Sequence, residues 1–382
     1  MPKINIIREF GADVSRETFK TQTMNENFYK YDVIVIGGGL AGSAAAGAAS
    51  NAGARTLLIS INMDSLAAMQ FGNYFTAEDV KTALHHLQKG ESLMTNIIRK
   101  NILAEVREKN KGFEGLEGFW IIDRKRFALQ VKEMLESQKK LDTRQALAAE
   151  VSDDENGFII STSDSIEIKA RSVIICAGTF LNASMCWGDN KIKAGRPGEI
   201  YSSRLYKSLI KRGLKFREET LFSAPKILGN TIDSSPENIQ IYKGGRAGIY
   251  SVSGIGKNVF GKTGKRLYLM PEGLETNEMY VYGFENDISE KEQINRLLNI
   301  KGLENIYMTR PGYRIEYGCL EADETGRELE AKEYAGLFFA GRITGTDSNG
   351  YSLLQGYLSG INAVRAIKGK KLISIDKFVK RY

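Results

Sequence analysis

Two glycine-rich segments at opposite ends of the chain constrain its fold more than any other feature of the sequence. Each segment follows a short apolar run, at residues 31–36 and 337–340, of the kind that forms a buried parallel strand. The residues that follow these runs are Gly37, Gly39, Leu40, Ala41 and Gly42 in the first segment, and Gly341, Arg342, Thr344, Gly345, Gln355 and Gly356 in the second. An apolar strand that runs into a glycine turn and a helix is typical of α/β proteins that bind dinucleotides.

The first segment has the order of a strand, a turn, a helix and a second strand. Gly37 permits a tight turn, Gly39 lets the backbone approach a pyrophosphate, and Gly42 lets the helix pack close to the strand. The helix at 42–51 is almost all Ala, Ser and Gly, and its first amides offer hydrogen bonds to an anion. With a second strand at 55–60, the segment predicts a βαβ unit. The alternative is a glycine turn in an α/β fold that binds no ligand.

The two segments together indicate a flavin dinucleotide. A nicotinamide dehydrogenase needs only the first segment, whereas a flavoprotein commonly closes a late strand and helix over the flavin. We therefore expect FAD in the crevice between residues 37–42 and 341–356. The turn that follows the apolar run at 172–176 is expected to line the same crevice; it consists of Ala177, Gly178 and Thr179.

One residue of the dinucleotide pattern is missing. An acidic residue usually ends the second strand and binds a ribose hydroxyl. Here Ser60 and Asn62 stand at this place, and the first acid is Asp64. We expect Ser60 or Asn62 to bond the ribose instead.

The composition allows a large core and indicates neither a disulfide scaffold nor a metal site. The chain has 382 residues, 42% of them hydrophobic, and three cysteines without a CxxC pair. The two histidines are adjacent, so on a helix they would point in different directions and make a poor metal pair. We expect a cytoplasmic protein, and no run is long and apolar enough to predict a membrane span.

The net charge of +7 favours an anionic partner such as tRNA or rRNA. We expect two basic loops to bind phosphate, and solvated lysine faces are the alternative. The basic residues are Lys191, Lys193 and Arg196 in one loop and Lys257, Lys262, Lys265 and Arg266 in the other. A third basic group lies at 368–381, where phosphate binding and a solvated lysine face explain the pattern equally well.

The pattern of elements divides the chain into four parts. Residues 1–30 form a polar extension. Residues 31–194 and 326–382 form a Rossmann-type FAD-binding domain, an α/β domain whose parallel sheet carries a β-meander, and 195–325 form an inserted β-rich α+β domain that presents the substrate. The expected elements include a mostly helical stretch at 78–111, a helix at 123–138, strands at 158–162 and 165–169, a separate strand at 172–176, a serine-capped helix at 289–298 and a closing helix at 351–368.

Five stretches, in order along the chain, resemble the family of MnmG, also called glucose-inhibited division protein A. This family is the large FAD-binding subunit of the bacterial tRNA wobble-uridine modification enzyme. More distantly, the chain resembles the folate-dependent tRNA uracil methyltransferase TrmFO. The stretches are residues 56–69, 177–181 with 195–198, 269–278, 310–317 and 336–356. The resemblance implies the fold, FAD and an RNA uridine substrate, with NAD(P)H as reductant and a folate as carbon donor.

The sequence departs from this resemblance where covalent catalysis would take place. The resemblance implies a catalytic cysteine in the loop after Met69 and a second one in the insertion, but residues 69–73 and 248–253 contain no thiol. A uracil is activated when a thiolate adds to C6, and Ser251 would be a far weaker nucleophile. Of the three cysteines, Cys176 is expected in the core and Cys186 in a loop. Cys319 is the candidate catalytic thiol, since nearby arginines would lower its pKa, and a packing role is the alternative.

The resemblance also implies a long helical C-terminal region that binds tRNA and a GTPase partner. The chain stops at Tyr382, so we expect a truncated and diverged relative that does not bind the GTPase partner. A homodimer of this chain is a further expectation. The leading hypothesis is an FAD-dependent oxidoreductase of the RNA-modifying class. The alternatives are an FAD-dependent oxidoreductase that acts on a small molecule and a non-catalytic flavin-binding protein.

Overall fold

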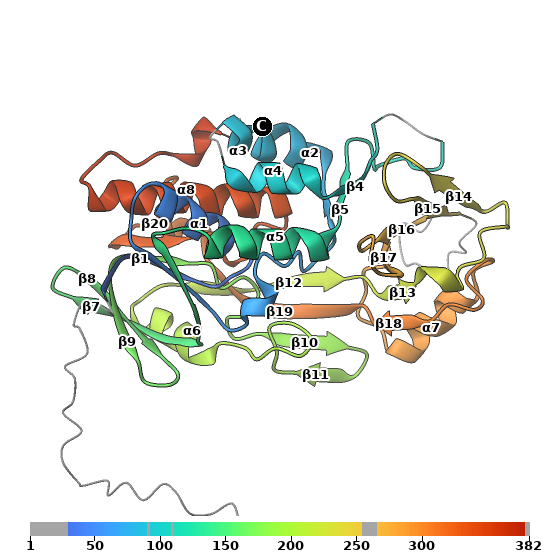
Figure 1. Ribbon diagram of the computed structural model, residues 1–382. Coiled ribbons are helices and arrows are strands. Elements are labelled where there is room, and N and C mark those ends of the chain that lie inside the picture. The colour runs from blue at the N-terminus through green and yellow to red at the C-terminus, as the bar shows by residue number, and fades with distance from the viewer. Residues whose placement is uncertain (1–29, 90–91, 108–110, 254–265, 379–382) are drawn as a thin grey trace, which may run out of the picture.

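The structure is a computed structural model that describes residues 30–89, 92–107, 111–253 and 266–378 (Figure 1). The predictions made for residues 1–29, for the C-terminal Lys380 and Arg381, and for Lys257, Lys262 and Lys265 lie outside the described residues.

The largest sheet has the strand order β20-β21-β9-β1-β2-β6 and is parallel from β21 to β6. Its strands are β1 (Lys30–Ile36), β2 (Thr56–Ser60), β6 (Leu141–Gln145), β9 (Glu167–Ile175), β20 (Glu330–Ala331) and β21 (Tyr334–Phe339). An antiparallel meander of β7 (Ala148–Asp154) and β8 (Gly157–Thr162) extends from β9. The predicted α/β class, with a parallel Rossmann-type sheet and a β-meander, is confirmed.

Alternate residues of the central strand serve two separate cores. Val33 and Val35 pack with the helices α1 (Leu40–Asn51), α5 (Arg124–Glu136) and α8 (Asn349–Ile367). Ile34 and Ile36 pack on the other face with the meander and α6 (Ser203–Lys211). Figure 1 shows α1, α5 and α8 above the sheet and α6 below it. Because other elements cover both faces of β1, its residues 33–36 are all apolar.

Three smaller sheets complete the fold. One has the order β11-β10-β19-β12, the second β14-β15-β16-β17-β13-β18 and the third β3-β5-β4. Their strands are β3 (Tyr74–Phe75), β4 (Ile102–Glu105), β5 (Trp120–Ile122), β10 (Ser184–Trp187), β11 (Asn190–Ile192), β12 (Phe216–Ser223), β13 (Lys226–Leu228), β14 (Ile239–Tyr242), β15 (Ile249–Val252), β16 (Leu267–Pro271), β17 (Glu278–Tyr282), β18 (Met308–Arg310) and β19 (Tyr313–Leu320). Figure 1 shows β12 and β19 running between the large sheet and the lobe that holds β13 to β18.

The predicted inserted segment 195–325 contains elements that belong to more than one core. The six-stranded sheet packs α7 (Glu290–Leu298) on one face and the three-stranded sheet on the other. Helix α6, by contrast, contributes Leu205 and Leu209 to the core of the large sheet. The limits of the inserted domain therefore stay a prediction.

Several predicted elements match the structure. Helix α7 begins after Ser289, whose side chain accepts a hydrogen bond from the Glu292 amide, so the serine cap is confirmed. The helices that follow β3 are α2 (Ala77–Asp79), a π-helical turn (Val80–Leu84), α3 (His85–Lys89) and α4 (Leu93–Lys100). The prediction of helix beyond residue 100 is wrong, because α4 ends at Lys100 and the next apolar residues pair with β5 as strand β4.

Two strand predictions need correction. Residues 165–169 and 172–176 were expected as separate strands, yet β9 is one strand from Glu167 to Ile175. The polar Ser172 does not interrupt it, because its hydroxyl donates to the Gly336 carbonyl at 2.6 Å inside the sheet. Cys186 lies in β10, paired with Arg314 of β19, and not in a loop.

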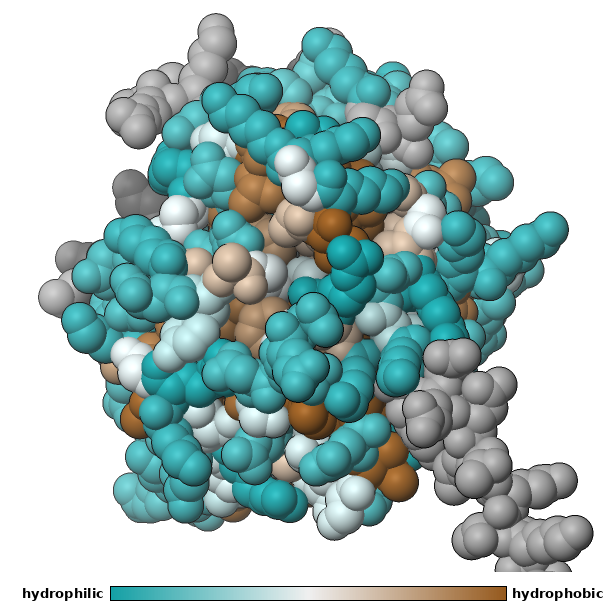
Figure 2. Space-filling model, turned by 90° about the vertical axis from the view of Figure 1, so that its left-hand side faces the viewer, coloured by the Kyte–Doolittle hydropathy of each residue, from teal (hydrophilic) through white to brown (hydrophobic). Residues whose placement is uncertain are grey.

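The surface is mixed in character. Figure 2 shows the face at the left of Figure 1, where hydrophilic side chains cover most of the area and hydrophobic ones lie in hollows between them. Among the described helices, none is long and apolar enough to cross a membrane.

Candidate cofactor site

A crevice opens at the carboxyl ends of β1, β2 and β9. Helix α1 leads from β1 to β2 on one side, and β9 pairs with β1 on the other, so the strand order reverses at β1. Open α/β sheets bind ligands at such a switch point. The residues that line the crevice include Gly37, Gly39, Ser60, Ala177, Gly178, Arg196 and Glu199.

The first glycine segment lies at the floor of this crevice, and its glycines differ in what an added side chain would meet. Gly37 has φ +104°, and a Cβ there would lie 2.3 Å from the carbonyl oxygen of Cys176, the residue that follows β9. A Cβ on Gly42 would lie 1.7 Å from the Gly37 carbonyl oxygen. Gly39 differs, because a Cβ there would meet no atom within 4 Å. Two glycines are thus required by the fold, whereas Gly39 faces open space.

The first turn of α1 presents backbone amides to that open space. Gly39 is the N-cap, and no side chain caps the helix. The first amides of a helix have no intrahelical acceptor, and those of α1 belong to the segment Leu40–Ala41–Gly42. Such a terminus binds anions through these amides and the helix dipole. The donors present therefore fit a pyrophosphate.

The second glycine segment packs directly against this turn. A Cβ on Gly356 would lie 2.0 Å from the Ala41 carbonyl oxygen, and one on Gly341 would lie 2.7 Å from the Ala41 Cβ. Gln355 fixes the segment, since its side-chain oxygen accepts from the Gly341 amide at 2.8 Å and the Thr344 hydroxyl at 2.9 Å. Residues 300 or more positions apart in the chain are thus in contact at this turn.

The remaining predicted residues of this segment, Arg342 and Gly345, follow Gly341 in the chain. The Arg342 guanidinium stands over the Phe71 ring at 4.7 Å, and burial lowers the Arg342 pKa. Gly345 is exposed, with φ +87° and the Arg217 side chain nearby. Their roles toward a cofactor stay predictions.

Other predicted residues serve the protein around the crevice. The Thr179 hydroxyl is buried and donates to the Gly195 carbonyl at 3.0 Å. Asn62 lies at the end of β2, where its side-chain nitrogen donates to Glu199 at 3.1 Å. Sequence reasoning missed Glu199 as a crevice residue, although the segment 195–198 was recognised as a motif, because no local pattern places residue 199 beside residue 62.

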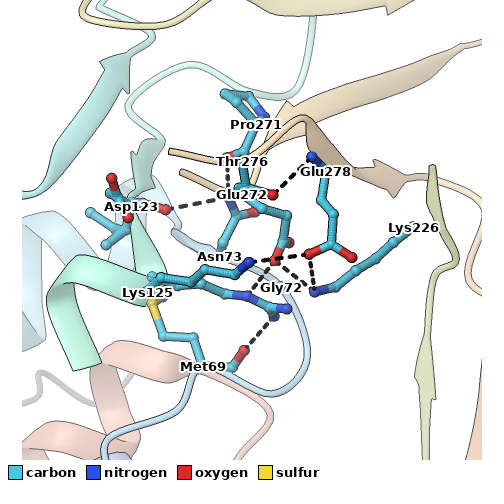
Figure 3. Close-up of polar contacts among 12 residues, drawn as sticks. Met69, Gly72, Asn73, Asp123, Lys125, Lys226, Pro271, Glu272, Thr276 and Glu278 are labelled. Atoms are coloured by element: carbon cyan, nitrogen blue, oxygen red, sulfur yellow. Dashed lines mark hydrogen bonds and ion pairs between the residues drawn. The ribbon is translucent and has the colours of Figure 1, made fainter. Parts of the chain in front are cut away.

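A buried ionic cluster lies between α5 and the six-stranded sheet (Figure 3). Glu272, at the end of β16, has no exposed surface, and its carboxylate pairs with Arg124 and with Lys226, the latter at 2.8 Å. Arg124 also donates to the Met69 carbonyl at 3.0 Å, and Asn73 donates to the Pro271 carbonyl at 2.6 Å. The cluster therefore ties the loop after β2 to the inserted sheet. No pattern in the sequence indicates this cluster.

Burial raises the pKa of Glu272 to about 6, and the nearby Arg124 only partly opposes this. A folded-state pKa above the unfolded value of 4.5 means that the folded state binds more protons between these pH values. The stabilisation is full below about pH 4.5 and is lost as the pH rises through about 6.

We expect the free energy of unfolding of the wild type, relative to Glu272→Gln, to fall by about 2 kcal/mol across this pH window. Urea denaturation of both proteins at several pH values measures the difference. A difference that instead rises with pH would show a carboxylate stabilised in its charged form.

The structure contradicts the expected environment of Cys319. Its side chain has no exposed surface, and burial raises its pKa to about 11, against the lowering effect of Arg217. The thiol donates to the Ile343 carbonyl at 3.4 Å. The predicted lowering of its pKa by Arg310 and Arg314 is wrong, because burial outweighs the nearby charge. A catalytic role for Cys319 stays a prediction, and the geometry favours the packing role.

The other candidate nucleophiles are also buried. Burial raises the pKa of both Cys176 and Cys186. Ser251 has no exposed surface, and its hydroxyl donates to the Gly112 carbonyl.

We expect all three thiols to react slowly with a disulfide reagent in the native protein, because the thiolate is the reactive form and none is exposed. The absorbance of the released thiolate should report about three equivalents only after denaturation. A fast native reaction that Cys319→Ser abolishes would restore Cys319 as a reactive thiol.

The fold and the crevice define the class of the protein. The fold of FAD-dependent oxidoreductases combines a parallel sheet with a meander, a glycine turn at the switch point that leads into an uncapped helix, and a late strand and helix that pack against this turn. The sequence profile of the family described as Glucose inhibited division protein A matches residues 32–251 and 250–371. The chain belongs to this family, so the resemblance seen in the sequence is confirmed.

Individual relatives agree with this assignment. The chain is 30% identical over 398 residues to the tRNA uridine 5-carboxymethylaminomethyl modification enzyme MnmG of Flavobacterium johnsoniae. The matched region covers 87% of this chain and 62% of the relative. The same enzyme of Christiangramia forsetii is 30% identical over 411 residues, covering 92% and 64%. The chain thus spans less than two thirds of these relatives.

Solved structures give the same picture. The form II crystal structure of Aquifex aeolicus GidA superposes with a TM-score of 0.83 at 25% identity, covering 91% of this chain and 65% of that one. Glycine oxidase from Geobacillus kaustophilus shares the fold, with a TM-score of 0.52. Its identity to this chain is 13%, and the superposition covers 93% of this chain and 100% of that one.

Proposed function

We propose that the chain binds FAD in the crevice and acts as an FAD-dependent oxidoreductase on a uridine of RNA. One observation carries the cofactor assignment: Gly341 and Gly356 pack on the uncapped first turn of α1, beside the open space at Gly39. The RNA substrate is supported by the relatives, which are named as tRNA uridine modification enzymes.

The residues of the crevice have separate tasks in this proposal. The amides of Leu40 and Ala41 hold the pyrophosphate, and Gly39 gives it room. The segment fixed by Gln355 covers the flavin. Bound flavin supplies hydride or one-carbon chemistry, with NAD(P)H as the proposed reductant and a folate as the proposed carbon donor. Residues 61–75 contain no cysteine, so no thiol from this loop adds to the uracil.

A small-molecule substrate is the second candidate, and one observation favours it. Two cations of the basic loop predicted to bind phosphate are already paired: Lys191 with Glu316 at 2.6 Å, and Arg196 with Glu199. The loop therefore offers RNA less free positive charge than its composition suggests.

Two measurements on the purified protein test the proposal. Titration with FAD should give a perturbed flavin spectrum and a saturable affinity, and no uptake of FAD would refute the cofactor assignment. Binding of tRNA should then weaken steeply as salt rises, because phosphate contacts release counterions. Flavin binding without RNA binding at low salt would favour the small-molecule substrate.

A further inference from the structure

Glu199 brings a carboxylate to the end of β2, where the sequence lacks the usual ribose-binding acid. It follows the motif 195–198 and lines the crevice together with Ser60 and Arg196. Its carboxylate accepts from the Asn62 side chain at 3.1 Å and pairs with Arg196. Glu199 therefore stands at the position of the missing acid although it comes from a segment far along the chain.

The two residues expected to bond the ribose are already engaged with the protein. Asn62 uses its side-chain oxygen to accept from the Asp64 amide at 2.8 Å and its nitrogen to donate to Glu199. The Ser60 hydroxyl donates to the Asn62 carbonyl at 3.1 Å. Asn62 thus holds Glu199 in place, and both polar atoms of its side chain are already bonded to the protein.

The carboxylate of Glu199 keeps one oxygen for a ligand. Asn62 and Arg196 both bond Oε1, and no described residue donates to Oε2. The side chain is 12% exposed, so its orientation is fixed by its neighbours. A ribose hydroxyl donates to a carboxylate, and the paired Arg196 offsets the negative charge that would otherwise repel a pyrophosphate.

We propose that Glu199 accepts hydrogen bonds from the adenosine ribose of the dinucleotide and replaces the acid that β2 lacks. This inference rests on the proposed FAD site. It also connects cofactor binding to the loop 195–199, which leads toward α6 and the inserted sheets.

The test compares FAD with an FAD whose adenosine is 2′,3′-dideoxy and so lacks both ribose hydroxyls. Quenching of flavin fluorescence gives both dissociation constants. We expect the wild type to bind the dideoxy compound about 10- to 100-fold more weakly, as for a hydrogen bond to a charged group. In Glu199→Ala this ratio should fall to about threefold or less, and Glu199→Gln should lie between because it keeps the shape without the charge.

The matched control is Glu292→Gln, which breaks an exposed glutamate–arginine pair on α7 and should leave both constants unchanged. Equal binding of the two compounds by the wild type, or a wild-type ratio in Glu199→Ala, would overturn the inference. Should the alanine variant fail to fold, the isosteric glutamine variant and the wild type decide the question. Failure of the FAD site itself is distinct, since no flavin would then bind.

Discussion

Replacing Gly356 with alanine is expected to destabilise the protein by about 3 kcal/mol or more. The new Cβ would lie 2.0 Å from the Ala41 carbonyl oxygen and 2.7 Å from its carbonyl carbon. Both atoms belong to the backbone of α1, so the clash is relieved only when α8 moves away from α1. Urea denaturation monitored by circular dichroism measures the change.

The control for this experiment lies in the same helix pair. A Cβ on Gly47 would meet only side-chain atoms, the nearest at 3.6 Å, so Gly47→Ala should stabilise the protein by about 0.5–1 kcal/mol through its helix propensity. Equal stability of the Gly356 and Gly47 variants would mean that α8 does not lie against α1 as described.

Replacing Gly39 with alanine is expected to leave the fold intact and to lower the affinity for FAD by about 10- to 100-fold. The backbone of Gly39, with φ −68°, suits alanine, and its Cβ would meet no protein atom within 4 Å. The methyl group would instead occupy the space that the proposed pyrophosphate needs. Fluorescence titration with FAD, alongside a thermal melt without FAD, separates the two effects.

Gly47→Ala again provides the control, since it lies in α1 but away from the first turn, and its FAD affinity should equal that of the wild type. If Gly39→Ala binds FAD as tightly as the wild type, the pyrophosphate does not rest on the first turn of α1, and the proposed site is wrong.

The glycines of the first segment show why the βαβ unit could be predicted from the sequence. Gly42 is required by its contact with Gly37, and Gly37 adopts φ +104°, a conformation that favours glycine. These constraints act within the βαβ unit, so the spacing of the two glycines could be read from the sequence. The contact of Gly37 with Cys176, by contrast, joins residues far apart in the chain. The alternation of Val33, Ile34, Val35 and Ile36 between two cores follows from strand geometry in the same way.

The wrong predictions came from considering only neighbours in the sequence. The apolar spacing that indicated a helix through Ile102 and Leu103 was overridden by strand pairing with β5, in which Ile102 lies opposite Ile122. The expected low pKa of Cys319 considered only charged neighbours and missed the burial that raises it. Desolvation depends on what packs around a group, and sequence neighbours do not report it.

The sequence by itself determined the fold class, the family, the βαβ unit and the two glycine segments, because short-range sterics and strand and helix periodicity encode these features. Only the tertiary structure decided that Gly356 rests on Ala41, that Glu199 meets Asn62 and that Glu272 is buried between two cations. The contact between Asn62 and Glu199 spans 137 positions of the chain, and the contacts of Gly356 with Ala41 and of Glu272 with Arg124 span more. Packing of whole layers brings them together, and no local pattern records which distant side chains will meet.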